Sequence, residues 1–262
     1  MARTVLITGA GSGIGRGIAL AFARRGWRLL LAGRSPAHLQ ATADEAGPSG
    51  VNGVYSVDLA DSQARDRLID AVLREQGVPE LLINNAAVLP AGPLTEQTTA
   101  EIEAAVALNL LAPAVLTRRF CAATPPPQGV LFILSTAARF PQPFNSLYSA
   151  TKSGLRALAE SLQVELAGKT RVGLVYPPVT ATPMTERFDP GRWPIRKADP
   201  LAVGERIAAA YEAGRDDIGW FDWESLPSLL YRAAPALFRQ LLKSQRRTLQ
   251  AWFSSSKTGQ KP

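Results

Sequence analysis

Cysteine and histidine are nearly missing from this chain, whose 262 residues include one of each, Cys121 and His38. A single cysteine excludes a disulfide within the chain and is typical of a reducing compartment. A single histidine argues against a histidine-based metal site and against a serine–histidine–aspartate triad. We therefore expect a function that needs neither a bound metal ion nor a histidine base.

Long apolar runs are also missing. No uninterrupted apolar run reaches the roughly 20 residues that a membrane-spanning helix needs. The first apolar run, at 5–7, starts so soon after Met1 that we expect no signal peptide. Apolar residues make up 46% of the chain, as in an ordinary globular protein, and we expect a cytoplasmic location.

Acidic residues are absent from 225–262, a tail that holds seven basic residues. The other 22 basic residues equal in number the 22 acidic residues, all of which lie in 1–224. The formal net charge of +7 therefore belongs to the tail. A body without net charge argues against a nucleic-acid-binding face.

The tail has an amphipathic helical pattern that Pro235 interrupts, so two helical pieces are expected. The favoured interpretation is that the tail packs on the body or on a second subunit and leaves its charges in water. The alternative is that 226–247 lies on the anionic inner face of a membrane, which would favour a hydrophobic substrate. The apolar members of the pattern are Leu226, Leu229, Leu230, Ala233, Leu237, Phe238, Leu241 and Leu242.

Short apolar runs alternate with helical patterns along 1–182. The runs are apolar throughout, which predicts parallel strands covered by helices on both faces. We therefore expect an α/β fold: a doubly wound Rossmann domain in 1–224, a substrate lid at 183–200 and a helical extension at 225–262. Strands are expected at 5–7, 29–32, 51–57, 81–83, 130–134 and 172–175, and helices at 14–25, 62–76, 99–122 (bent near Pro113) and 146–167.

A glycine-rich segment, Thr-Gly-Ala-Gly-Ser-Gly-Ile-Gly at 8–15, joins the first expected strand to the first expected helix. Glycines let the backbone turn tightly and approach a pyrophosphate closely. The start of the helix offers N–H groups and the positive end of its dipole. In a doubly wound fold this position predicts a dinucleotide site.

Tyr148 and Lys152 lie four residues apart, so the expected helix places both side chains on one face. A positive neighbour favours phenolate and lowers the pKa of a phenol from about 10 toward the working pH. Taken alone, this spacing is common on surface helices, and it gains meaning only from the other motifs.

Together the motifs resemble those of the short-chain dehydrogenase/reductase family. Segment 8–15 matches its Thr-Gly-x-x-x-Gly-x-Gly signature, and the resemblance covers about 4–182 and points to the compact NADP-preferring branch. It implies a homo-oligomer. Many members of the family end in a strand with an Asp-Gly-Gly sequence that packs across a tetramer axis, and this chain lacks that sequence, which favours a dimer over a tetramer. The later motifs follow in the family's order: Asp58-Leu59, Asn84-Asn85-Ala86, Asn109, Ser135 and Tyr148-x-x-x-Lys152.

The resemblance implies a catalytic tetrad of Asn109, Ser135, Tyr148 and Lys152. Tyr148 would protonate the carbonyl oxygen during hydride transfer, and Ser135 would hold that oxygen. Lys152 would lower the Tyr148 pKa and hold the nicotinamide ribose, while Asn109 would anchor a water that supplies Lys152 with protons. The expected function is NADP(H)-dependent reduction of a ketone or aldehyde. The alternatives are NAD(P)-linked oxidation of a secondary alcohol and a non-catalytic NADP(H)-binding sensor or scaffold.

The segment after the second expected strand predicts the choice of cofactor. It reads Gly33-Arg34-Ser35 and lacks the acid that usually binds the ribose of NAD, whereas Arg34 can hold a 2′-phosphate with help from Ser35. We therefore expect NADPH rather than NADH. The resemblance implies that the cofactor contacts Thr8, Gly9, Gly11, Ser12, Gly13, Ile14, Gly15, Arg34, Ser35, Asp58, Leu59, Asn85, Ala86, Tyr148, Lys152, Pro177, Val179 and Thr182. Pro178 stands where the family has glycine, which leaves the contacts of 177–182 with the nicotinamide open.

Overall fold

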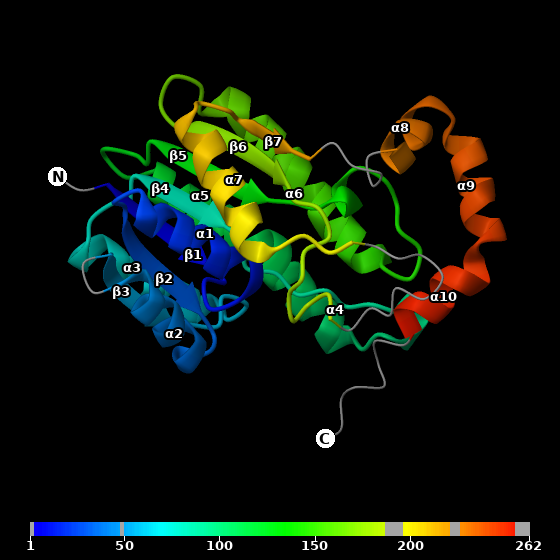
Figure 1. Cartoon of the computed structure of the whole chain (residues 1–262), viewed down its shortest axis with the longest axis horizontal. Helices are drawn as coiled ribbons and strands as arrows, with labels where there is room; N and C mark the ends of the chain where they lie inside the picture. Colours follow the sequence, from blue (N-terminus) through cyan, green and yellow to red (C-terminus); the bar gives the residue numbers. More distant parts are fainter. Residues whose placement is uncertain (1–2, 48–49, 187–195, 221–225, 255–262) are drawn as a thin grey trace.

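One parallel sheet organises the protein. The computed structural model describes residues 3–47, 50–186, 196–220 and 226–254. Within them, seven strands pair in the order β3-β2-β1-β4-β5-β6-β7, every pair parallel (Figure 1). The order reverses between β1 and β4, so the sheet is doubly wound, as expected. The strands are β1 Thr4–Thr8, β2 Arg28–Gly33, β3 Val51–Ser56, β4 Leu81–Asn84, β5 Gly129–Ile133, β6 Arg171–Tyr176 and β7 Asp217–Gly219.

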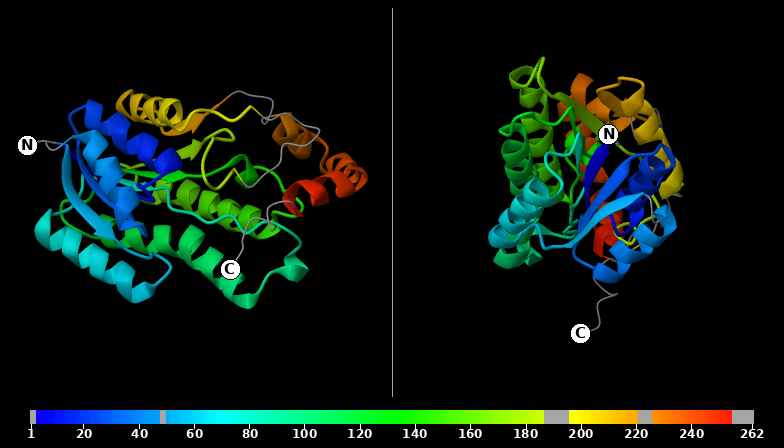
Figure 2. Two further views of the ribbon diagram at one scale, coloured as in Figure 1. Left: turned by 60° about the horizontal axis from the view of Figure 1, so that its bottom comes forward. Right: turned by 90° about the vertical axis from the view of Figure 1, so that its left-hand side faces the viewer.

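Helices cover both faces of the sheet (Figure 2). On one face lie α1 Gly13–Arg24, α2 Pro36–Ala46 and α7 Pro200–Glu212. On the other lie α3 Ser62–Glu75, the helix formed by α4 Thr99–Val106 and α5 Ala112–Cys121, and α6 Ser146–Glu165. Short 3-10 turns, η1 Leu94–Glu96 and η3 Thr136–Ala138, precede α4 and α6. The expected strands are all present, whereas α7 and β7 were not predicted.

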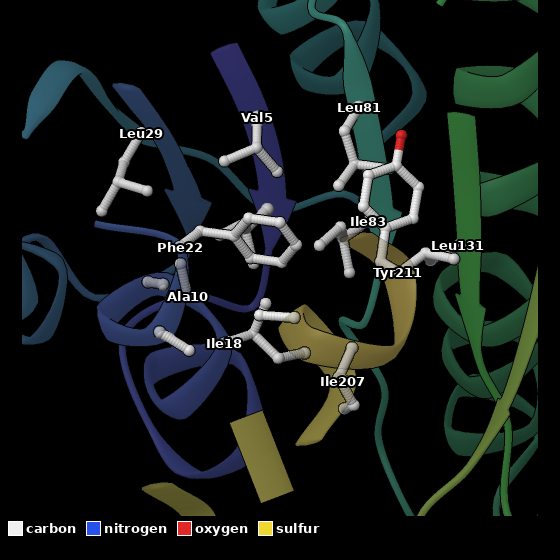
Figure 3. Close-up of a cluster of buried hydrophobic side chains, with 14 of the residues drawn as sticks. Val5, Ala10, Ile18, Phe22, Leu29, Leu81, Ile83, Leu131, Ile207 and Tyr211 are labelled. Atoms are coloured by element: carbon white, nitrogen blue, oxygen red, sulfur yellow. The ribbon is translucent and has the colours of Figure 1, made fainter. Parts of the chain in front are cut away.

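The apolar run of β1 is continuous because both faces of this strand are buried. Val5 and Ile7 point into the cluster under α1 and α7, while Leu6 points into the cluster under α3, α5 and α6. Figure 3 shows part of the first cluster, where Phe22 of α1 lies beside β1 and Ile207 of α7 lies near Ile18 of α1. Each such side chain, removed from water, contributes about 1.5–3 kcal/mol.

The helix expected at 99–122 has its irregularity at Asn109, not at Pro113. A π-helical turn, η2 Ala107–Leu111, joins α4 to α5, and Pro113 lies within the first turn of α5. By length and composition the resulting helix, Thr99–Cys121, is apolar enough to cross a bilayer, contrary to the expectation from uninterrupted runs. This is weak evidence for a membrane span, because Leu116 and Phe120 are buried in the core of the sheet domain.

The tail forms α8 Leu226–Ala233, α9 Pro235–Ser244 and α10 Arg246–Ser254, three pieces where two were expected. They make an arc at the end of the molecule opposite α2 and α3 (Figures 1 and 2). Pro235 starts α9, as its fixed φ and missing N–H favour. Half of the lid predicted at 183–200, including Phe188 and Trp193, falls in 187–195, outside the described residues.

Candidate active site

The glycine-rich turn between β1 and α1 can be built only from glycine at several positions. Gly9 and Gly13 have φ of 67° and 51°, in the left-handed region. A Cβ on Gly15 would lie 2.1 Å from the Gly9 carbonyl oxygen, so no larger residue fits there. No side chain therefore covers the backbone around the start of α1, and the N-terminus of a helix favours a negatively charged group.

The turn is tied to the end of β4. The Thr8 hydroxyl accepts hydrogen bonds from the backbone N–H groups of Asn85, at 2.9 Å, and Ala86, at 3.0 Å. The Asn85 amide donates back to the Thr8 carbonyl at 2.8 Å. Thr8 is buried, so its hydroxyl aligns the two strand ends instead of facing the cavity that they border.

A cavity of about 670 Å³ runs from this turn along the carboxyl ends of the strands. Most of the residues predicted to bind a cofactor line this cavity, whereas Thr8 and Asp58 do not. The Asp58 carboxylate accepts a hydrogen bond from the Ala60 N–H at 2.9 Å. The predicted residues that line the cavity are Gly9, Gly11, Ser12, Gly13, Ile14, Gly15, Arg34, Ser35, Leu59, Asn85, Ala86, Ser135, Tyr148, Lys152, Pro177, Val179 and Thr182.

One end of the cavity carries Arg34, Ser35 and His38. Arg34 is exposed just past β2, and the Ser35 hydroxyl caps α2 by accepting the His38 N–H at 3.3 Å. The polar sequence around His38 predicts only an exposed residue at a helix start. His38 is exposed, and it also lines the cavity, which its polar sequence neighbours gave no reason to expect.

The other end of the cavity holds Ser135, Tyr148 and Lys152, which approach from two elements. Ser135 caps η3 just beyond β5, and its hydroxyl accepts the Ala137 N–H at 3.2 Å. Tyr148 and Lys152 come from one face of α6, and the Tyr148 hydroxyl is hydrogen-bonded to the Ser135 side chain. The structure therefore brings these three side chains together, as the motif spacing predicted.

The expected lowering of the Tyr148 pKa by Lys152 is not found. Burial raises the pKa of Tyr148 to about 12, and the hydrogen bond with Ser135 only partly offsets this. Burial also lowers the pKa of Lys152 to about 8. The Lys152 ammonium donates to the Ile133 carbonyl at 2.7 Å and lies 5.8 Å from the centre of the Tyr148 ring. Loss of hydration therefore dominates the titration of both groups.

Asn109 lies behind the cavity, fully buried in the π-helical turn. Its side-chain oxygen accepts the Val88 N–H at 2.9 Å, and its amide donates to the Val88 carbonyl at 2.9 Å. The same amide donates to the Thr151 hydroxyl at 3.1 Å. The side chain thus joins the loop after β4 to the residue before Lys152, and it does not line the cavity.

Pro178, the departure from the family pattern, does not displace its neighbours from the cavity. Pro177, Val179 and Thr182 all line it, and the Pro178 carbonyl accepts the Thr180 hydroxyl at 2.8 Å. A Cβ on Gly13 would lie 2.7 Å from the Thr182 methyl group, so Thr182 covers the glycine-rich turn directly.

The fold is that of a known family. A family profile described as short chain dehydrogenase matches residues 3–193. An uncharacterized oxidoreductase of Myxococcus xanthus is 35% identical over 198 residues, covering 70% of this chain and 74% of that protein. The chain belongs to the short-chain dehydrogenase/reductase family and is an oxidoreductase of that type.

Two further relatives show how far the likeness extends. L-xylulose reductase of Bos taurus is 35% identical over 186 residues, covering 70% of this chain and 73% of that enzyme. The solved structure of a short-chain dehydrogenase from Sphingobium yanoikuyae in complex with NADPH superimposes with a TM-score of 0.73 at 27% identity, covering 99% and 98% of the two chains. In some other relatives the matched share of their own length falls to 55% or 18%, so those proteins extend beyond the common region.

Proposed function

We propose that this protein reduces a ketone or an aldehyde to an alcohol with NADPH. The observation that carries the proposal is one continuous cavity, with a glycine-lined turn and Arg34 toward one end and Tyr148, Ser135 and Lys152 toward the other. The NADPH complex of the Sphingobium relative and the reductase activity named for the bovine relative support it.

The cofactor supplies a hydride when it is bound, and the residues of the glycine-rich turn fit its pyrophosphate because no Cβ narrows the approach. A Tyr148 hydroxyl with a pKa of about 12 stays protonated at neutral pH and is ready to protonate a developing alkoxide. Ser135, hydrogen-bonded to that hydroxyl, is positioned to hold the same oxygen. Lys152 supplies positive charge 5.8 Å from the centre of the Tyr148 ring and would hold the nicotinamide ribose.

Asn109 acts as a positioning residue in this proposal. Its side chain is occupied by Val88 and Thr151, so a water that it anchors would bind its backbone carbonyl. A π-helical turn shifts hydrogen bonds by one residue and is frequent at functional sites. The link through Thr151 also fixes the segment of α6 that carries Lys152.

The direct test is consumption of NADPH by the purified protein with aliphatic, aromatic and acyl carbonyl compounds. Turnover with any of them, and less with NADH, supports the proposal. Turnover only of secondary alcohols with oxidised cofactor would favour the dehydrogenase alternative. Tight NADPH binding without turnover of any carbonyl or alcohol would favour the sensor alternative.

The titration of Lys152 predicts a pH profile. Because burial lowers its pKa to about 8, its positive charge is lost as the pH rises through about 8, well below the ordinary range for lysine. Tyr148 remains protonated over the same range. We expect kcat/KM for NADPH, which reports the free enzyme, to be flat near pH 7 and to fall about tenfold per pH unit above about 8. A profile that stays flat to pH 10 would contradict the role given to the Lys152 charge.

For assembly we propose a cytoplasmic homodimer. Val106 and Leu111, on the α4–α5 helix, are 40% and 48% exposed, and this apolar surface supports pairing of two copies. Light scattering should give twice the chain mass of 28.1 kDa. Sedimentation with anionic and neutral vesicles tests the tail: no pelleting is expected, whereas pelleting with anionic vesicles alone would favour the membrane alternative.

A further inference from the structure

The cavity lining also includes apolar side chains that were predicted neither as cofactor-binding nor as catalytic residues. Met184, from the segment after β6, and Phe140, five residues after Ser135, form two walls of this apolar part. A third wall comes from the tail, where α8, α9 and α10 contribute Pro227, Leu242 and Leu249 respectively. Each of the three tail helices thus reaches the same cavity as the catalytic side chains.

The tail is held against the body by an aromatic contact. Phe238 of α9 is 5% exposed, and its ring meets Phe140 edge-on with ring centres 5.6 Å apart. It also meets Tyr231 of α8, with ring centres 5.5 Å apart. This contact fixes the rotation of α9 about its own axis.

That rotation decides which leucines face the cavity. Leu242 lies four residues after Phe238, on the same side of α9, and it lines the cavity. Leu241, one residue earlier, points elsewhere and is 46% exposed. The two leucines have the same chemistry and lie side by side on one helix, but only one of them borders the site.

Charge is scarce on this part of the wall. Among the described residues, the lysines and arginines that line the cavity are Arg34, Lys152 and Lys197, and none of them belongs to the tail. The basic tail residues Arg232, Arg239 and Lys243 are exposed. The wall therefore offers apolar contact to whatever extends past the reacting carbonyl group.

We propose that α8–α10 form the outer wall of the substrate cavity and select carbonyl compounds with a bulky apolar substituent; this inference rests on the proposed function. Leu242 and Leu249 are the specificity-determining residues. The wall lies beyond residue 193, where the match to the family profile ends, so the profile does not include these residues. A tail that packs on the body, as the favoured interpretation expects, would thus also help to select the substrate.

The test compares Leu242→Ala with the matched control Leu241→Ala, using butan-2-one and nonan-2-one as substrates. We expect Leu242→Ala to lower kcat/KM for nonan-2-one about tenfold or more, because lost apolar contacts in a pocket have effects of this size. For butan-2-one, which lacks a long apolar substituent, kcat/KM should change less than twofold. Leu241→Ala should leave both ketones within twofold of the unmodified protein.

Equal losses for the two ketones, or equal effects of the two substitutions, would overturn the proposal. If Leu242→Ala does not fold, as judged by circular dichroism, Leu249→Ala on α10 replaces it with the same expectations. Calorimetric titration with nonan-2-one provides a readout that does not depend on turnover. If the unmodified protein reduces no carbonyl compound of the screen, the proposed function fails; weaker titration of Leu242→Ala with nonan-2-one would still support the apolar wall, and unchanged titration would overturn it.

Discussion

Replacing Tyr148 with phenylalanine is expected to lower kcat for carbonyl reduction by about 10³-fold or more while NADPH still binds. The substitution removes one buried hydroxyl, the one hydrogen-bonded to Ser135, and retains the ring that packs near Lys152. A positioned general acid contributes about 10²–10⁴-fold, so its loss should dominate the rate. Single-turnover kinetics would measure the chemical step, and fluorescence titration would measure NADPH binding.

A second tyrosine provides the control for Tyr148→Phe. Tyr176, at the end of β6, is also buried, and burial also raises the pKa of its hydroxyl, but it lies outside the cavity lining, with the Arg139 guanidinium 3.9 Å from its ring centre. Tyr176→Phe should retain kcat within about threefold, a loss that ordinary repacking explains. If Tyr148→Phe retained as much activity as Tyr176→Phe, the proton would have to come from another group.

The parts of the site that the sequence predicted are those dictated by local backbone geometry and by spacing. Gly9, Gly13 and Gly15 are required because the turn has positive φ angles and no room for a Cβ. Tyr148 and Lys152 share a face because four residues make about one helical turn. Each requirement is satisfied within a few residues of chain, and so it can be read without knowing the tertiary structure.

The features that escaped prediction depend on which distant segments pack together. The pKa of Tyr148 rises because its hydroxyl is buried in the folded protein, and the residues next to it in the sequence do not predict this burial. The Asn109 side chain is hydrogen-bonded to Val88 and Thr151, and these residues come together only when the helix that carries Asn109 packs against α6. Leu242 reaches the cavity because Phe238 meets Phe140, about a hundred residues earlier in the chain. The apolar pattern of the tail predicted helices but not which of their faces would meet the body.

Replacing Arg34 with aspartate should shift the cofactor preference toward NADH by about 10²-fold or more. Arg34 is exposed at the cavity end next to Ser35 and His38, where a 2′-phosphate on the adenosine ribose would be bound. A charge-assisted hydrogen bond contributes about 1.5–3 kcal/mol, and an aspartate would repel the phosphate besides removing that bond. The same aspartate can accept hydrogen bonds from the unmodified ribose of NADH. The measurement is the ratio of kcat/KM for NADPH to that for NADH.

The matched control for Arg34→Asp lies at the other end of the same strand. Arg28 is exposed at the amino end of β2 and does not line the cavity. Arg28→Asp changes the net charge by the same amount as Arg34→Asp. If Arg34 acted only through the general positive field of the protein, both substitutions would move the ratio alike, and both effects would vanish at high salt. A contact with the phosphate instead predicts that Arg34→Asp alone changes the ratio. Equal ratios for the two variants would therefore remove the basis for preferring NADPH, while leaving the role of Tyr148 intact.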